Sequence, residues 1–121
     1  MIKFKSLNQS KQFLKILKKK KLNTKYFTIY FEKNLNNTKK SNNKDLNISF
    51  IVKKNIGNAV IRNRIKRKLK TAVQKILGGR RDIDLNYTYL ILGKNNVYRD
   101  KFSLIFSEAN NAFKKIKLVS N

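Results

Sequence analysis

A helix with one apolar stripe and one basic face is encoded between positions 60 and 77, and it constrains the fold more than any other segment. Its apolar residues recur at helical spacing and share one side at about 100° per residue. They are Ile61, Ile65, Leu69, Ala72, Val73 and Ile76. Six of the nine residues from Arg62 to Lys70 are arginine or lysine, and most of them fall on the opposite side. An ordinary surface helix gains more from mixed charges four residues apart, so this face is suited to a polyanion.

The composition agrees with that interpretation. The 121 residues carry a net charge of +24, and self-repulsion at this level opposes compaction unless a polyanion neutralises it. A hydrophobic content of 40% with eight Phe and five Tyr is enough for a core, so we expect one domain over residues 1–121. Nucleic acid is the favoured partner because phosphate neutralisation releases counterions, and a membrane surface is the alternative polyanion. No segment has the apolar run of a transmembrane helix or a signal peptide.

Catalytic equipment is sparse in this sequence. It contains no Cys and no His, which removes thiolate metal sites and the commonest general base. The six carboxylates are scattered, and none forms an acid/base pair by its spacing: Glu32, Asp45, Asp82, Asp84, Asp100 and Glu108. We therefore expect that any chemistry in which the chain takes part is done by another molecule.

Residue patterning predicts three helices and three strands without an internal repeat. In chain order they are a helix over 10–20, strands over 26–31 and 46–53, a helix over 60–77 closed by Gly78 and Gly79, a strand over 87–92, and a helix over 101–117 capped by Asp100. A helix between two strands usually makes a parallel crossover. The expected architecture is an α+β sandwich, with helices packed on a small mixed sheet.

Alternation within the strand over 26–31 separates two kinds of side chain. Tyr26, Thr28 and Tyr30 share one face, and the purely apolar Phe27, Ile29 and Phe31 share the other. Polar-tipped aromatics on a sheet face favour an open groove rather than a core. We expect Tyr30 to line such a groove.

The segment from Gly57 to Arg67 resembles the signature of the bacterial ribonuclease P protein subunit. It reads Gly-Asn-Ala-Val, one variable residue, then Arg-Asn-Arg-Ile-Lys-Arg. This string is long and ungapped, and therefore more specific than a lone glycine motif. The remainder agrees in order and spacing, with an early helix that contains Phe13, an aromatic strand that contains Phe27 and Tyr30, and a late strand followed by a helix.

The resemblance implies a non-catalytic subunit of an RNA-based endoribonuclease. Ribonuclease P removes the 5′ leader from precursor tRNA, and in bacteria its RNA subunit is the catalyst. The small protein binds that RNA, contacts the single-stranded leader and favours productive Mg²⁺ binding, with the ions held by RNA and none bound tightly by the protein. The expected partners are ribonuclease P RNA and precursor tRNA, without a membrane, in the bacterial cytoplasm.

The resemblance also implies a particular fold. The family is an α/β sandwich of about four strands and three helices, with a left-handed crossover around the basic helix, whereas crossovers are generally right-handed. It has one more short strand than the patterning reveals. We expect that strand near 22–25, before the aromatic strand.

Two surfaces carry the function in such proteins. The first contacts the catalytic RNA and is matched here by Asn58, Arg62, Asn63, Arg64, Lys66, Arg67, Lys68 and Lys70. The second is a cleft between the first helix and the sheet that receives the leader, lined by Phe13, Leu17 and Tyr30 with Lys53 and Lys54 at its edge. Aromatics there stack on bases and cations hold phosphates. One departure is Asn55, which stands where the family has a second lysine before the Ile-Gly step.

Three alternatives belong to other classes of protein. A ribosomal protein that binds rRNA would be equally small and basic, but such proteins often carry long basic tails. A sequence-specific DNA-binding protein would use the basic helix as a recognition helix, which usually needs a second helix at a short turn. A protein-only nuclease is disfavoured by the missing histidines.

Overall fold

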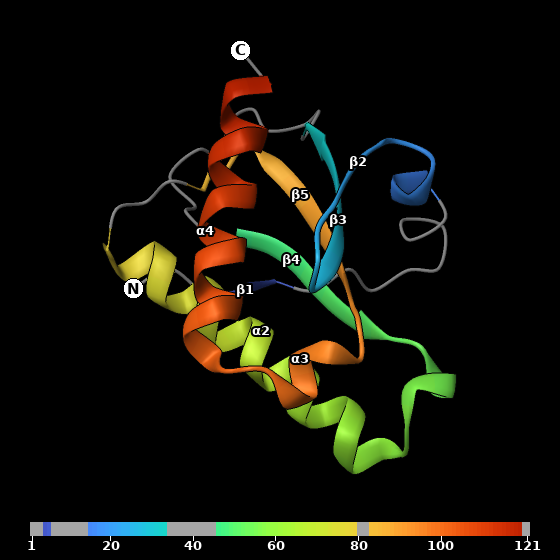
Figure 1. Ribbon diagram of the computed structural model, residues 1–121. Helices are drawn as coiled ribbons and strands as arrows, with labels where there is room; N and C mark the ends of the chain where they lie inside the picture. The colour runs from blue at the N-terminus through green and yellow to red at the C-terminus, as the bar shows by residue number, and fades with distance from the viewer. Residues whose placement is uncertain (1–3, 6–14, 34–45, 80–82, 120–121) are drawn as a thin grey trace.

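A five-stranded mixed sheet forms the centre of the computed structural model, and two long helices cover one of its faces (Figure 1). The structure describes residues 4–5, 15–33, 46–79 and 83–119. The strands are β1 (Phe4–Lys5), β2 (Lys20–Asn23), β3 (Phe27–Lys33), β4 (Leu46–Val52) and β5 (Tyr87–Gly93), in the spatial order β1-β4-β5-β3-β2. The helices are the short η1 (Lys54–Ile56), α2 (Ala59–Gly79), α3 (Asn96–Arg99) and α4 (Phe102–Val119).

The predicted α+β class is confirmed, and the N-terminal prediction needs one correction. Residues 15–17 are helical, but the helix does not continue to position 20, because the chain turns at Lys18 and enters β2 at Lys20. This strand is the additional one that the resemblance implied, and it lies two residues earlier than expected. Positions 10–14 of the predicted helix lie outside the described residues. The sequence did not predict β1 or α3.

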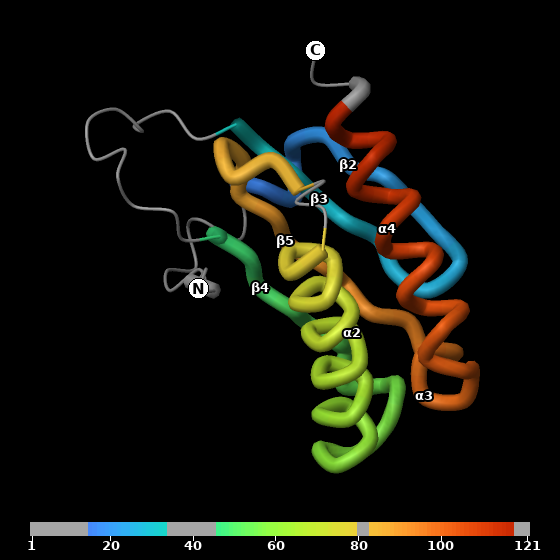
Figure 2. The backbone as a smooth tube through the Cα atoms, turned by 90° about the vertical axis from the view of Figure 1, so that its left-hand side faces the viewer, coloured from blue at the N-terminus to red at the C-terminus, as the bar shows by residue number. Residues whose placement is uncertain are grey.

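The crossover around α2 joins two neighbouring parallel strands. β4 pairs with β5 in the register Ile48↔Tyr89 and Phe50↔Ile91, and the connection between them runs through η1 and α2. When β4 is followed along the chain with α2 toward the viewer, β5 lies to its left (Figure 2). The crossover is therefore left-handed, as the resemblance implied and against the general preference.

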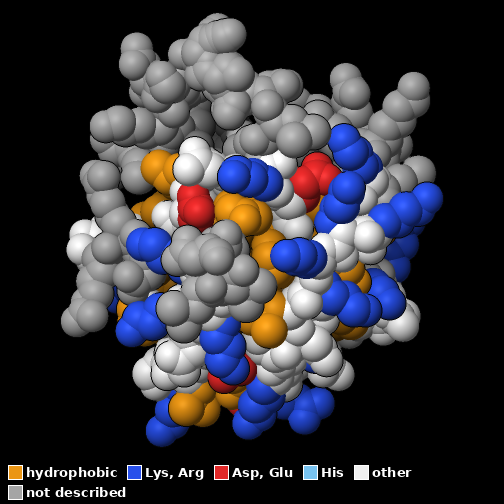
Figure 3. All heavy atoms as spheres, turned by 90° about the horizontal axis from the view of Figure 1, so that it is seen from above, with side chains coloured by type: hydrophobic (Ala, Val, Ile, Leu, Met, Phe, Trp, Pro, Cys, Tyr) orange, Lys and Arg blue, Asp and Glu red, His pale blue; other side chains and the backbone are white. Residues whose placement is uncertain are grey.

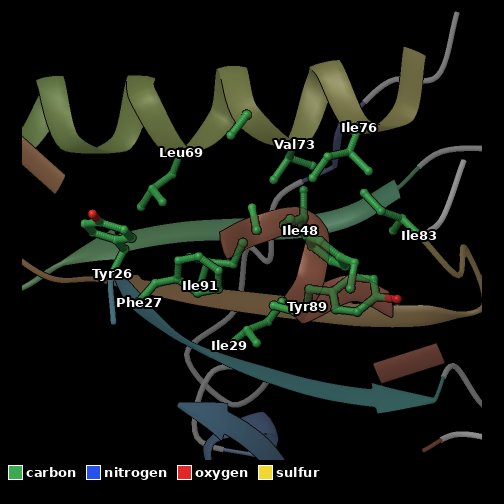
Figure 4. Close-up of a cluster of buried hydrophobic side chains, with 14 of the residues drawn as sticks. Tyr26, Phe27, Ile29, Ile48, Leu69, Val73, Ile76, Ile83, Tyr89 and Ile91 are labelled. Carbon is green, nitrogen blue, oxygen red and sulfur yellow. The ribbon is translucent and has the colours of Figure 1, made fainter. Parts of the chain in front are cut away.

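The core lies between this helical layer and one face of the sheet. Leu69, Val73 and Ile76 of α2 point toward Ile48 and Ile91 of the sheet (Figure 4). The predicted apolar stripe is confirmed, since its members from Ile65 to Ile76 are buried and Ile61 is half-buried. α4 adds a second buried stripe consisting of Ile105, Ala109, Ala112, Phe113 and Ile116.

Close approach of α2 to the sheet explains the glycine at the end of β5. A Cβ atom on Gly93 would lie 2.9 Å from Ile65 Cγ2 and 2.9 Å from Leu69 Cδ1, which is too close for carbon atoms. We expect Gly93→Ala to lower the free energy of unfolding by about 1–3 kcal/mol, because α2 must move outward. Urea denaturation followed by circular dichroism measures this loss.

Gly78 in the last turn of α2 offers a matched control. A Cβ atom there meets nothing within 4 Å. Gly78→Ala is expected to raise the free energy of unfolding by about 0.5–1 kcal/mol through helix propensity alone. Losses of similar size at both glycines would show that the packing of α2 on Gly93 is not the cause.

Tyr26 corrects the expected division of faces. It precedes β3 and lies in the turn between β2 and β3, where the Thr24 N–H donates to the Phe27 carbonyl at 2.8 Å. The strand alternation does not reach it, and the side chain is buried in the main core instead of sharing a face with Tyr30. Its hydroxyl donates to Asp100 Oδ2 at 2.6 Å. The carboxylate expected to cap the last helix thus accepts a hydrogen bond from a tyrosine that is 74 residues away in the sequence.

The Tyr26–Asp100 bond makes stability depend on alkaline pH. The hydrogen bond to Asp100, then burial, then the negative charges of Asp100 and Glu108 raise the pKa of Tyr26 from 10.0 to about 12. The folded state keeps a proton that the unfolded chain loses, so the stabilisation is complete below pH 10 and is lost as pH rises toward about 12. We expect the advantage of the wild type over Tyr26→Phe, measured by denaturation, to vanish across this window. A constant difference would contradict the assignment.

Candidate nucleic-acid interface

The basic helix begins at a well-defined cap. Asn58 Oδ1 accepts the Ile61 N–H at 3.0 Å, and the Asn58 carbonyl accepts the Arg62 N–H at 3.0 Å. This is the bonding of a helix N-cap, in which a side-chain oxygen satisfies a free backbone donor. Asn58 was expected to contact RNA, and the structure gives its side-chain oxygen a role in starting α2.

Beyond the cap, α2 exposes a ridge of polar and cationic side chains. Asn63, Arg64 and Arg67 are exposed, and Lys70 is exposed one turn further along. Lys66 is half-buried on the flank of this ridge. Arg62 is also half-buried, because its Nε–H donates to the Gly57 carbonyl at 3.1 Å. That bond uses one of the five guanidinium donors and holds the arginine beside the turn that precedes α2.

Lys68 has a different environment from its neighbours. Its ammonium group donates to three carbonyl oxygens, those of Val97 at 2.9 Å, Tyr98 at 3.4 Å and Asp100 at 2.9 Å. A lysine has three N–H donors, so these acceptors can use all of them. The sequence placed Lys68 among the RNA-contacting residues, but its contacts here tie α2 to α3 and to the start of α4.

A second surface lies on the face of the sheet turned away from α2 and α4. Tyr30 is half-buried there, opposite Lys21 of β2 and Leu90 of β5. Leu90 and Ser49 are buried on this face but do not belong to the main core, and the same is true of Ile16. Figure 1 shows the helical turn at 15–17 on this side of the sheet. Tyr30 thus lies on an amphipathic face beside that turn.

The remaining residues of the expected leader cleft are spread along this face. Leu17 is 44% exposed beside the buried Ile16. Lys53 and Lys54 are exposed at the exit of β4, and Lys53 is four residues, about 13 Å of extended chain, beyond the position level with Tyr30. Phe13 lies outside the described residues. The separation suits an extended strand of several nucleotides rather than a single one.

A third feature, absent from the sequence predictions, is a hollow between α2, α3 and the start of α4. Its volume is about 690 Å³, and it is lined by Arg64, Arg67, Lys68, Thr71, Tyr98 and Phe102. Phe102 stacks on Phe106 with ring centroids 6.3 Å apart, and Lys75 Nζ lies 5.6 Å from the Phe102 ring. Tyr98 is 39% exposed. We call this feature the α2–α3 hollow.

Cationic side chains are not restricted to α2. Figure 3 shows lysine and arginine distributed over the face seen from above, with acidic side chains interspersed. Within the described ranges, no helix is long and apolar enough to cross a membrane. In the same part of the chain, no cluster of three or more His, Cys, Asp or Glu side chains could hold a metal ion.

The chain combines a mixed α+β fold, an exposed arginine ridge on one helix and an amphipathic, lysine-flanked sheet face, and these are features typical of proteins that bind polyanions. Comparison with known families identifies which one. The model of the family described as Ribonuclease P matches residues 1–117. The chain belongs to the Ribonuclease P protein family.

Individual relatives agree with the family match. The chain is 31% identical over 85 residues to the ribonuclease P protein component of Carboxydothermus hydrogenoformans, which is 70% of this chain and 66% of that protein. It is 30% identical over 71 residues to the ribonuclease P protein component of Paramagnetospirillum magneticum, which is 59% of this chain and 52% of that protein. These alignments span less than two-thirds of either relative's length.

Solved structures show the same fold over a longer stretch. The RNase P protein from Thermotoga maritima superposes with a TM-score of 0.70 at 22% identity, covering 92% of this chain and 96% of that one. The RNase P protein of Staphylococcus aureus superposes with a TM-score of 0.67 at 18% identity, covering 93% and 94%. At this identity the likeness establishes the fold.

Proposed function

We propose that this chain is the protein subunit of a bacterial RNA-based ribonuclease P. In this role it binds the catalytic RNA and the 5′ leader of precursor tRNA, and it assists endonucleolytic removal of that leader. The observation that carries the proposal is the ridge of Asn63, Arg64 and Arg67, which exposes three side chains on the segment that matches the family signature. Arginine forks suit phosphate better than lysine does.

The ridge on α2 is proposed to contact the catalytic RNA. Arg62, Lys66 and Lys70 flank it and add positive charge. Two of the residues first expected here are proposed to act indirectly, since Asn58 caps the helix and Lys68 fastens it to α3. Their replacement is expected to weaken RNA binding by disordering the helix or its support rather than by removing a contact.

The face that contains Tyr30 is proposed to receive the leader. A tyrosine ring stacks on bases of any identity, and the exposed lysines at 53 and 54 attract the phosphates further along the strand. Phe13 and Leu17 are proposed to close the same cleft from the side of the N-terminal helix. Asn55 is exposed next to Lys54, so either Lys53 and Lys54 supply the charge of the family pattern from one residue earlier, or one contact to a leader phosphate is weaker.

Mg²⁺ is proposed to act through the RNA subunit. The RNA holds the ions that activate water, while the protein lowers the ion concentration needed by neutralising phosphate repulsion. Precursor tRNA is made in the bacterial cytoplasm, and we place the protein there.

The test is cleavage of precursor tRNA by a bacterial ribonuclease P RNA at low Mg²⁺, with and without the protein. Cleavage at the mature 5′ end only when both are present supports the proposal. Cleavage by the protein alone refutes the assignment of the chemistry to RNA. Tight RNA binding without any effect on cleavage favours a structural rRNA-binding protein.

Tyr30→Ala tests the leader surface separately. We expect affinity for leader-bearing precursor tRNA to fall about 5- to 150-fold in the complex with the catalytic RNA, as for the loss of one base-stacking contact. Affinity for mature tRNA should not change, and Tyr30→Phe should behave like the wild type because it keeps the ring. Equal losses for precursor and mature tRNA would show that Tyr30 only supports the sheet.

A further inference from the structure

We propose that the α2–α3 hollow takes one unpaired base of the catalytic RNA, stacked against Tyr98 and Phe102, while Arg64 and Arg67 hold the phosphates on either side of it. The identity of the partner rests on the proposed function. The site itself rests on the meeting of cations and aromatic rings in one concave surface.

The lining has the composition of a nucleotide-binding site. Tyr98 is 39% exposed and lines the hollow, so its aromatic ring is accessible to a ligand there. Phe102 also lines the hollow, is half-buried, and stacks on the ring of Phe106 at an angle of 29°. Arg64 and Arg67 reach the same hollow from α2. Rings that take a base and cations that take its phosphates are the two elements by which proteins bind unpaired nucleotides.

The backbone that carries Tyr98 is fixed before any ligand arrives. Lys68 bonds the carbonyls of Val97, Tyr98 and Asp100, the Val97 side chain is fully buried, and the Asp100 carboxylate accepts the Tyr26 hydroxyl. A four-residue helix such as α3 would not hold an exposed ring in place by itself. The hydrogen bonds of Lys68 already restrict this backbone in the free protein. Binding therefore costs less conformational entropy.

The position of the hollow favours the catalytic RNA over the leader. Arg64 and Arg67 belong both to the exposed ridge of α2 and to the lining of the hollow. An RNA bound to the ridge therefore lies next to the opening of the hollow. Tyr30 lies on the opposite face of the sheet, away from this helical layer. Bases inside a duplex are already stacked, so only an unpaired nucleotide can enter.

Fluorescence gives a direct test, because the natural chain contains no tryptophan. Tyr98→Trp places one indole in the hollow, and Leu104→Trp places one on α4 at a 50% exposed position that does not line it. Titration with the catalytic RNA should quench the fluorescence of the first indole until the signal saturates. The RNA concentration that gives half of this quenching should equal the concentration that half-saturates binding. The fluorescence of the second indole should stay nearly unchanged. Quenching of the first indole by precursor tRNA alone, and not by the catalytic RNA, would overturn the choice of partner.

Affinity measurements complete the test. Tyr98→Ala should weaken binding of the catalytic RNA about 5- to 150-fold, and Tyr98→Phe should restore it, because stacking needs the ring and not the hydroxyl. The salt dependence of Tyr98→Ala should equal that of the wild type, since no phosphate contact is lost. Unchanged affinity of Tyr98→Ala together with no quenching would overturn the inference while leaving the proposed function intact. Failure of the wild type to bind the catalytic RNA would overturn both.

Discussion

Replacing Arg64 and Arg67 together with alanine is expected to lower the affinity for the catalytic RNA by about 10²- to 10⁴-fold at moderate salt. Both side chains are exposed on one side of α2, and each presents a planar fork of donors that matches phosphate oxygens. A hydrogen bond to a charged group contributes about 1.5–3 kcal/mol, so two such losses give the stated range. Anisotropy of a labelled full-length RNA subunit measures the change.

Two controls distinguish the specific contribution of the ridge arginines from the general effect of removing two positive charges. Lys114→Ala with Lys115→Ala removes the same number of charges from exposed positions on α4, and we expect a much smaller loss. Arg64→Lys with Arg67→Lys keeps the charge but not the fork, and should fall between the wild type and the double alanine variant. Equal losses for the two alanine pairs would remove the assignment of the ridge.

Binding of the catalytic RNA by the wild type is expected to weaken by about 10³- to 10⁵-fold between 50 and 200 mM monovalent salt. This range corresponds to the release of counterions from six to ten phosphates. A chain of 121 residues with a net charge of +24 has enough cations for that number, even though Lys68 uses its donors inside the protein. A loss below about tenfold would mean that apolar or base contacts dominate instead.

The slope of this dependence distinguishes the kinds of contact. Removal of both ridge arginines should lower the slope of log affinity against log salt by about two, one for each phosphate. Tyr98→Ala should weaken binding without a change in slope. If the variant without Arg64 and Arg67 keeps the slope of the wild type, its loss of affinity comes from altered folding rather than from lost phosphate contacts. Circular dichroism of the variant would show such a change directly.

Long amphipathic segments were predictable because the spacing of their apolar residues also determines which side chains pack into the core. The predicted helix over 60–77 differs from α2 by one residue at its start and two at its end, and the strands over 46–53 and 87–92 differ from β4 and β5 by one residue each. In each case one series of side chains is buried or half-buried along the element. Handedness of the crossover came from the resemblance, because periodicity contains no information about it.

β2 could not be read from its residues. Lys20 and Lys21 continue a lysine run that suits a helix end, and only Leu22 is apolar enough to mark a buried side. The strand exists because β3 offers an open edge on which it pairs, with Lys21 opposite Tyr30. Lysines are tolerated at such an edge because they point into solvent.

The part of the candidate site that depends on which side chains of a helix are exposed was predictable. The part that depends on hydrogen bonds to residues far away in the sequence was not. Asn63, Arg64 and Arg67 lie on the exposed side that helical periodicity assigns to them. Lys68 finds its acceptors 29 to 32 residues away, and Asp100 finds Tyr26 at a separation of 74 residues. No local pattern marks such bonds, so the α2–α3 hollow was missed as well.

Strand order has a consequence for synthesis on the ribosome. β3 lies between β2 and β5, yet β5 begins 54 residues after β3 ends. At roughly 5–20 residues per second, β3 waits about 3 to 11 s with one edge unpaired. An apolar strand in that state is a site of association between nascent chains. Lysines that precede it in sequence, at 18–21, and the lysine that ends it, at 33, make neighbouring chains repel each other during the wait. The net positive charge of the chain thus also protects the unfinished sheet.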